Sequence, residues 1–416
     1  MPEPIDSLVA HGRVRAARQH IERSDEHTLA RQAALSAIPA PTGAEGARGA
    51  HLAELYRQVG LEAVVVDEVG NVTGWMGQRR DDAVVLSAHL DTVFGAGLDV
   101  SVERRGARLA GPGISDNARG LAALVTVAEA LVRAGVSTLR PVRFTATVGE
   151  EGDGDLRGVR HLFDGRVGAQ HAAPLQSPPS RPHVFIALDG AGIERIVHRA
   201  LGARRYRVTY LGPGGHSWAA FGVANPANAV GRATALLADL PTHHVPRPAG
   251  SPLGRTTCAV VRLGGGTGLN SIPQEAWFDL DLRSEEPQAL AQLDATVQGI
   301  LARALAEENS HRTAGTPPLR LDLRLVGDRP SGLTPRAHPL VQTAIAATRA
   351  LGRTHELACA STDANVPIAL GVPAIALGAG GHAGDAHLPT EWYENVDGSL
   401  GVVRALLVTA AMAEVR

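Results

Sequence analysis

The chain has few residues of the kinds that build disulfide-rich folds or nucleic-acid-binding surfaces. Its 416 residues include two cysteines, Cys258 and Cys359, and no Cys-x-x-Cys pair. A thiolate zinc site is therefore excluded, and any metal must be held by nitrogen and oxygen ligands. Aromatic residues make up 3% of the chain, which leaves few side chains on which bases stack. Lys+Arg 40 against Asp+Glu 42 gives a formal net charge of −2, so charge favours neither nucleic acid nor an anionic membrane as partner.

Long apolar runs are also missing. No stretch reaches the roughly 18–20 apolar residues that span a bilayer. Met1-Pro2-Glu3-Pro4 lacks the basic and apolar pattern of a signal peptide. We therefore expect a cytoplasmic protein without a membrane partner. Hydrophobic residues make up 44%, which indicates a folded chain, and the length favours two domains.

The first two hundred residues have the pattern of an α/β domain, in which apolar strand segments alternate with helical segments. Helices are expected over 7–38, 44–59 and 118–134, and strands over 61–66, 71–76, 83–89, 141–148 and 183–188. A further hairpin is expected around Arg105-Gly106. This alternation predicts a mainly parallel sheet with helices on both faces.

The pattern changes near residue 200 and returns near residue 334. Between these points we expect strands over 204–211, 257–263, 276–283 and 319–326, with helices over 226–239 and 287–307. They predict an inserted α+β domain with an antiparallel sheet and two helices on one face. The α/β pattern then continues with a helix over 338–352, a strand over 373–377 and a final helix. The expected domains are 1–201 with 331–416, and the insertion 202–330.

Histidine and carboxylate residues stand where apolar segments end. The strand over 83–88 runs into His89-Leu90-Asp91, and later segments end at Asp116, Glu150-Glu151, Asp189 and His387. Open α/β sheets bind ligands beyond the carboxyl ends of their strands. Neutral imidazoles and ionised carboxylates hold divalent cations. Because two ions about 3.5–4 Å apart need a bridging carboxylate, we expect Asp116 to bridge one ion held by His89 and Asp189 and another held by Glu151 and His387.

Two carboxylates remain for other roles. Asp91 is placed to accept the second N–H of the His89 imidazole and so fix its tautomer. Glu150 suits a general base that takes a proton from metal-bound water and passes it to a leaving amine.

Each of these residues also has a structural explanation. The Glu-Glu pair could be solvated surface charge, and Asp116 or Ser115 could cap a helix. Asp189 could belong to a turn with Gly190. His387 competes with His382 in the same glycine-rich loop.

The segments that carry these residues resemble the M20 dinuclear zinc peptidases, a family that includes peptidase T, carboxypeptidase G2 and the aminoacylases. The resemblance covers nearly the whole chain and rests on five segments: 87–93 (SAHLDTV), 113–120 (GISDNARG), 149–152 (GEEG), 187–190 (ALDG) and 385–391 (DAHLPTE). The residues that follow Asp116 and the acidic, glycine-rich segment 152–155 shift the match toward the peptidase T-like side of the family.

The resemblance implies two divalent ions, Zn²⁺ foremost with Co²⁺ or Mn²⁺ as alternatives. It also implies the ligands His89, Asp116, Glu151, Asp189 and His387, with Glu150 as general base. The resemblance further implies that the inserted domain is a lid that mediates homodimerisation.

Within the lid, the resemblance implies that His216 stabilises the oxyanion from the partner subunit. It assigns Asn270 and Arg283 to the substrate, with Arg283 on the substrate carboxylate, where a guanidinium forms two parallel hydrogen bonds. In structural terms, His216 could instead be a surface turn residue, and Arg283 could pair with Asp281 or Glu285.

These features predict a metal-dependent hydrolase that cleaves an amide bond of short peptides. The alternative is an N-acyl-amino-acid amidohydrolase with the same site, and a rival from another class is a metal-dependent binding module. The glycine run 264–268 lacks the Gly-Lys-Ser/Thr ending of a phosphate loop, so we expect no nucleotide. His243-His244 and the Pro/Ser-rich segment 171–182 are expected to be exposed loops without a role.

Overall fold

A computed structural model describes residues 4–164, 182–240 and 255–416 of the chain. It divides into two compact units, Met1–Ala200 with Leu333–Arg416, and Leu201–Gly332. These bounds lie within two residues of the division expected from the sequence. His243-His244 and all but the last residue of the loop expected over 171–182 lie outside the described residues.

The sheet of the first unit has, among the described residues, nine strands in the order β1-β2-β6-β3-β7-β17-β8-β15, with β16 paired to β8. The strands are β1 (Glu62–Val66), β2 (Val72–Met76), β3 (Val84–His89), β6 (Val142–Thr147), β7 (Val184–Leu188), β8 (Arg195–Ala200), β15 (Gly332–Leu333), β16 (Glu356–Ala360) and β17 (Ala374–Leu377). The central strands β6, β3, β7 and β17 are parallel, whereas β2 and β8 flank them antiparallel. The mainly parallel sheet expected from the sequence is confirmed.

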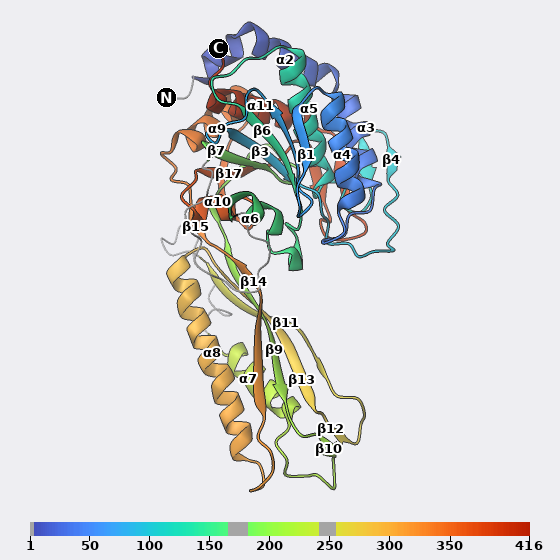
Figure 1. Cartoon of the computed structure of the whole chain (residues 1–416), viewed down its shortest axis with the longest axis vertical. Helices are drawn as coiled ribbons and strands as arrows, with labels where there is room; N and C mark the ends of the chain where they lie inside the picture. Colours follow the sequence, from blue (N-terminus) through green and yellow to red (C-terminus); the bar gives the residue numbers. More distant parts are fainter. Residues whose placement is uncertain (1–3, 165–181, 241–254) are drawn as a thin grey trace. The chain divides into compact units, whose positions relative to one another are not determined.

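Helices cover both faces of this sheet. They are α1 (Ile5–Ala10), α2 (Gly12–Arg23), α3 (Asp25–Ser36), α4 (Gly46–Gln58), α5 (Ala118–Arg133), α6 (Arg157–Asp164), α9 (Pro339–Ala350), α10 (Asn365–Ala369) and α11 (Gly398–Ala413). Side chains alternate along β3, so Val84 and Leu86 join the core under α2, α5 and α11, while Val85 joins the core on the other face with α6 and α10. Figure 1 shows the two groups of helices on opposite faces.

A small antiparallel sheet stands beside the main one. It contains β4 (Glu103–Arg105), β5 (Arg108–Ala110), β18 (His382–Gly384) and β19 (Trp392–Glu394), in the order β18-β19-β5-β4. Because β5 pairs with β19, the segment that follows Ala110 lies near the segment that precedes Trp392. These two segments carry Asp116 and His387.

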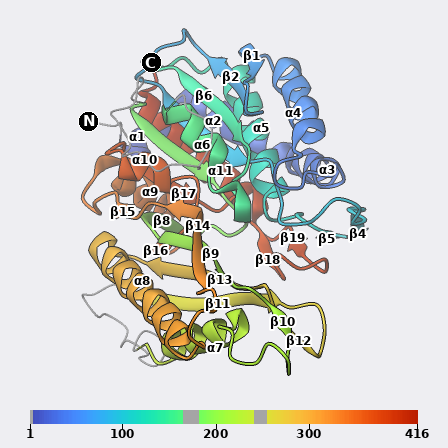
Figure 2. The ribbon, with the colours of Figure 1, turned by 60° about the horizontal axis from the view of Figure 1, so that its bottom comes forward.

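In its described residues, the second unit is an antiparallel sheet in the order β11-β13-β9-β14, with two helices on one face. Its elements are β9 (Gly202–Leu211), β10 (Gly215–His216), α7 (Pro226–Ala238), β11 (Thr256–Gly265), β12 (Ser271–Ile272), β13 (Glu275–Ser284), α8 (Pro287–Ser310) and β14 (Arg320–Arg329). Figure 2 shows α7 and α8 beside this sheet. Tyr206, Val208 and Phe278 point into the core under the helices. Arg207 lies on the opposite face, where it contacts Asp279 and stacks 3.9 Å from the ring centroid of Trp277.

Some local expectations were wrong. The helical segment expected over 7–38 is divided into three helices, because His11 is extended and Ser24 leaves the helical region. β8 and β16 were missed, since neither has a regular two-residue alternation of burial. Cys258 is buried and Cys359 is half-buried, and both are free thiols. Among the described helices, none combines the length and apolar character that a membrane span needs.

Candidate metal centre

The end of β3 places His89 and Asp91 at the edge of the parallel sheet. His89 is 3% exposed, and its Nδ1 lies 3.0 Å from the carbonyl oxygen of Asp91 and 3.5 Å from Oδ1 of the same residue. The nearer acceptor for this ring nitrogen is thus the backbone, not the carboxylate that the sequence suggested. The Asp91 carboxylate accepts the backbone N–H groups of Glu150 and Glu151, each at 2.9 Å. Asp91 therefore fixes the backbone that carries the Glu-Glu pair.

Asp116 lies between two imidazoles. Its Oδ1 is 3.0 Å from Nε2 of His89, and its Oδ2 is 3.2 Å from Nε2 of His387. The same nitrogen of His387 lies 3.2 Å from Oε1 of Glu151. Nε2 of His89 lies 3.9 Å from Oδ1 of Asp189. The two carboxylate oxygens of Asp116 thus face two different histidines, as a bridging ligand requires.

Among the residues that the structure describes, three groups of side chains have ligand atoms within 4.8 Å of one another. They are His89 with Asp116 and Asp189, Asp116 with Glu151 and His387, and His89 with Glu150 and Glu151. The first two share Asp116, and they are the two sets that the sequence assigned to the two ions. The structure brings all five expected ligands together, with Glu150 beside them. His382, the competing histidine, is exposed on β18 and belongs to none of these groups.

Glu391 holds the loop that carries Asp116. Its carboxylate is fully buried and accepts the backbone N–H groups of Gly113, Ser115 and Asp116 at 3.0, 2.8 and 2.8 Å. It also accepts the Ser115 hydroxyl at 2.6 Å. Sequence reasoning gave Glu391 no role, because nothing local connects it to residues about 275 positions earlier.

Asn117 joins this loop to the helix that follows. Its side chain accepts the N–H of Gly120 at 3.1 Å and donates to the carbonyl oxygen of Leu188 at 2.8 Å. Asn117 is therefore the N-cap of α5, and the alternative that Asp116 or Ser115 caps this helix is wrong. The Asp116–Asn117 peptide bond is cis.

A second buried carboxylate supports the site from the C-terminal part of the chain. Asp363, in the loop before α10, accepts a hydrogen bond from the Thr147 hydroxyl. Thr147 is the last residue of β6 and pairs with His89 across the sheet. The loop Ser361–Asn365 thus lies against the end of the strands that carry the cluster.

The cluster has an excess of carboxylates. Burial, together with the neighbouring charge of Asp116, raises the pKa of Asp189 to about 7. Hydrogen bonds to Asp116 and Glu151 raise the pKa of His387 to about 10. Burial lowers the pKa of His89, but its hydrogen bonds to Asp116 and Asp91 outweigh burial and raise it well above the ordinary value.

The site therefore stabilises positive charge. Its donor set of imidazole nitrogens and carboxylate oxygens, with more carboxylates than histidines, fits a pair of divalent cations.

His216 and Asn270 lie together in the second unit. β10 pairs with β12, which places His216 opposite Ser271, and the N–H of Ser217 donates to the carbonyl oxygen of Asn270 at 2.8 Å. Both residues are exposed. Nδ1 of His216 accepts the N–H of Trp218 at 3.2 Å, which fixes the ring in its turn.

Arg283 lies at the other end of the same sheet. On β13, Glu275 pairs with Leu211 at the end that leads to β10, whereas Arg283 pairs with Ala203. Eight residues of strand separate Glu275 from Arg283, which is roughly 26 Å. Nε of Arg283 donates to Asp281 at 2.7 Å, so the pair that the sequence offered as an alternative is formed. Within one copy of this unit, Arg283 does not lie with His216 and Asn270.

Histidines and carboxylates gathered at the carboxyl ends of parallel strands, with a buried glutamate beside them, define the class of metal-dependent hydrolases. A family model described as peptidase family M20/M25/M40 matches residues 85–413, and the chain belongs to this family. The enzyme class and the family expected from the sequence are confirmed.

Solved structures show the same fold. The chain is similar to the aminopeptidase PepT from Bacillus cereus, with a TM-score of 0.67, 20% identity and coverage of 94% of this chain and 99% of that one. A tripeptidase from Staphylococcus aureus has a TM-score of 0.70, 18% identity and coverage of 93% and 98%. An amidase of the hydantoinase/carbamoylase family from Burkholderia vietnamiensis has a TM-score of 0.68, 19% identity and coverage of 94% and 97%. No curated protein matches the chain by sequence.

Proposed function

We propose that this hydrolase cleaves an amide bond near the end of a short peptide at a site for two divalent ions, Zn²⁺ foremost, with Co²⁺ or Mn²⁺ as alternatives. The observation that carries the proposal is Asp116 at 3.0 Å from His89 and 3.2 Å from His387, with one oxygen toward each. His89 and Asp189 would hold one ion, and Glu151 and His387 the other. When bound, such ions polarise the scissile carbonyl and lower the pKa of a bound water toward about 7.

Glu150 is the general base of the proposal. It is 5% exposed and follows the buried strand β6. The hydrogen bond from its backbone N–H to Asp91 fixes its position. A carboxylate oxygen of Glu150 lies within 4.8 Å of ligand atoms of His89 and Glu151. Glu150 takes the proton from the attacking water and then delivers it to the leaving amine, so one residue serves as base and acid in turn.

The second unit supplies three further residues to the proposed mechanism: His216, Asn270 and Arg283. His216 stabilises the oxyanion of the tetrahedral state, Asn270 contacts the substrate, and Arg283 binds its carboxylate once released from Asp281. A dipeptide spans about 7 Å when extended, far less than the distance along β13 between Arg283 and the end of the strand next to His216. The separation therefore supports a homodimer in which His216 and Asn270 serve the substrate of the partner subunit.

A second candidate function is hydrolysis of N-acyl amino acids. It is favoured by the likeness to an amidase of the hydantoinase/carbamoylase family, whose TM-score of 0.68 is within 0.02 of those of the two peptidases. Assays of di- and tripeptides beside N-acyl amino acids separate the two functions. The cytoplasmic location expected from the sequence stays a prediction.

The test is the variant Glu150→Gln, compared with Glu62→Gln on the exposed strand β1 as a matched control. We expect turnover of short peptides to fall by roughly 10²–10⁴-fold in Glu150→Gln while two metal ions per chain are retained. Glu62→Gln should behave as the parent. Unchanged turnover in Glu150→Gln would refute the assignment of the general base.

A further inference from the structure

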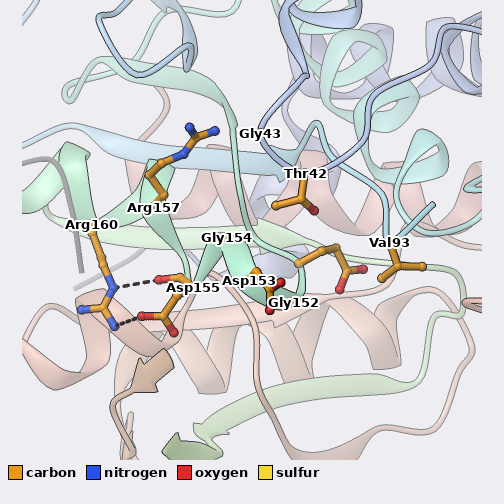
Figure 3. A pocket seen from close by; sticks show the side chains of 10 residues that line it. Thr42, Gly43, Val93, Gly152, Asp153, Gly154, Asp155, Arg157 and Arg160 are labelled. Atoms are coloured by element: carbon orange, nitrogen blue, oxygen red, sulfur yellow. Dashed lines mark hydrogen bonds and ion pairs between the residues drawn. The ribbon is translucent and has the colours of Figure 1, made fainter. Parts of the chain in front are cut away.

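A cavity of about 490 Å³ adjoins the metal centre within the first unit (Figure 3). Glu151, one of the proposed ligands, lines it. The rest of the wall comes from the short 3₁₀ helix η1 (Gly152–Gly154), the start of α6, Thr42-Gly43 and the half-exposed side chain of Val93. A substrate whose carbonyl lies at the cluster therefore has room on this side for an adjoining group.

Both guanidinium groups of the cavity wall are already paired with carboxylates. Nη2 of Arg157 lies 3.1 and 3.2 Å from the two carboxylate oxygens of Glu45. Arg160 donates to the carbonyl oxygen of Asp155 at 2.8 Å and to its carboxylate at 3.3 Å, as the dashed lines in Figure 3 show. Neither arginine adds uncompensated positive charge to the cavity.

Asp153 differs from these groups. It is exposed in the middle of η1, two residues after Glu151, and its carboxylate has no hydrogen bond or ion pair with any residue that the structure describes. When Glu151 binds a metal ion, Asp153 is the side chain of the described cavity wall whose negative charge is not compensated by a positive group. A carboxylate in this position attracts an ammonium group and repels a carboxylate.

We propose that this cavity receives the amino-terminal part of the substrate and that Asp153 selects a positively charged group there. The inference rests on the proposed function and narrows its substrate class to amides with an ammonium group on the acyl side. In a peptide cut at its first bond, the α-nitrogen is two bonds from the scissile carbonyl carbon, so a free α-ammonium necessarily lies beside the cluster. A lysine side chain on the same residue is the second source of such a group. An N-acyl amino acid with an uncharged acyl group offers neither.

The experiment uses the full-length, metal-loaded enzyme and four tripeptides: Leu-Gly-Gly, Lys-Gly-Gly and the N-acetylated form of each. kcat and KM for cleavage of the first peptide bond are measured by mass spectrometry for the parent, Asp153→Asn and Asp153→Glu. Asp81→Asn is the matched control. Asp81 is exposed in the same unit, but it lies before the first residue of β3, whereas the metal centre lies at the last residue of this strand. Melting temperatures of all variants confirm that they are folded.

We expect the parent to prefer Leu-Gly-Gly over its acetylated form. Asp153→Asn should lower kcat/KM for Leu-Gly-Gly by about fivefold, mainly through KM, as for a solvent-accessible ion pair. It should leave acetyl-Leu-Gly-Gly unchanged, and Asp153→Glu should restore part of the loss. If kcat/KM of Asp153→Asn falls equally for Leu-Gly-Gly and Lys-Gly-Gly and for neither acetylated form, Asp153 recognises the α-ammonium. If kcat/KM also falls for acetyl-Lys-Gly-Gly, Asp153 recognises the lysine side chain.

Three results would overturn the inference. One is an equal loss on all four substrates, which would indicate a structural role for Asp153. Another is no change in Asp153→Asn relative to Asp81→Asn. The third is a parent enzyme that cleaves all four substrates equally well, and this leaves amide hydrolysis itself standing. If none of the substrates is cleaved, the proposed function fails and the inference fails with it.

Discussion

The metal centre depends on carboxylates that are not among its expected ligands. Asp91 accepts the backbone N–H groups of Glu150 and Glu151, and the Thr42 hydroxyl donates to it at 2.9 Å. Burial raises the pKa of Asp91, but its hydrogen bond to His89 and its backbone partners outweigh burial and lower it, so the group stays ionised. Such supporting residues set the orientation and affinity of the ligands they hold.

A substitution at Glu391 tests whether its carboxylate holds the Asp116 loop in place for metal binding. In Glu391→Gln, an amide N–H replaces one acceptor oxygen and faces backbone N–H groups that need an acceptor. We expect metal affinity to fall by about 10–100-fold, measured by competition with a chelator, while the ligands themselves are intact. Glu394→Gln on the neighbouring strand β19 is the control. Equal affinities in the two variants would show that the Asp116 loop does not need Glu391.

The convergence of the expected ligands was predictable from the sequence, whereas the residues that support them were not. His89 ends the buried strand β3 and Glu151 comes shortly after the buried strand β6, and these positions in the sequence point to the edge of a parallel sheet. The contact between Glu391 and Ser115 depends on the pairing of β5 with β19, which no local pattern encodes. Likewise, the side chain of Asn117 caps α5 because Asp116 faces the histidines instead.

At the scale of elements, Glu129 joins three helices. It lies on α5 and is paired with Arg31 of α3 at 2.9 Å, with Arg133 of its own helix at 2.9 Å, and with His20 of α2 at 3.7 Å. Burial raises the pKa of Glu129, but the Arg31 hydrogen bond outweighs burial and lowers the pKa below its ordinary value of 4.5. Its ionised form therefore stabilises the packing of the N-terminal helices.

This shift predicts a dependence of stability on pH. Because the folded pKa is below the unfolded one, the contribution of Glu129 is fully present above about pH 4.5 and is lost as pH falls through the folded pKa. Glu129→Gln should lower the free energy of unfolding by about 1–2 kcal/mol at pH 7 and by less near pH 4. Denaturant titrations at both pH values measure this.

Glu22→Gln, which removes an exposed pair with Arg18, is the control and should change stability by less than about 0.5 kcal/mol. A loss in Glu129→Gln that is the same at pH 7 and pH 4 would contradict the electrostatic explanation.

The strongly periodic elements of the chain were predictable, and those that depend on tertiary contacts were not. α5 and α8 begin within a residue of their expected positions, because their apolar stripes are long. β8 and β16 carry charged or half-buried residues, and their strand structure depends on pairing: β16 pairs with β8, and β8 also pairs with β17 of the main sheet. The breaks at His11 and Ser24 are not marked by proline, so the sequence does not show where the helical segment 7–38 divides.

At the scale of the whole molecule, the proposed homodimer predicts complementation between two inactive variants. If His216 serves the partner subunit, a dimer of one Glu150→Gln chain and one His216→Ala chain contains one intact site. That site combines Glu150 of the second chain with the partner's His216. Random pairing of equal amounts gives half heterodimers, so coexpressed chains should recover about a quarter of the parent activity.

The measurement is the specific activity of the coexpressed pair against each variant alone. Recovery near a quarter supports a shared site, whereas activity no higher than the sum of the separate variants would place His216 in the site of its own chain.

The two-ion site is tested most directly by a crystal structure of the zinc-loaded protein, with anomalous scattering measured at the zinc edge. We expect two peaks about 3.5–4 Å apart, one beside His89 and Asp189 and one beside Glu151 and His387, with Asp116 in contact with both. A single peak, or peaks that do not share Asp116, would contradict it.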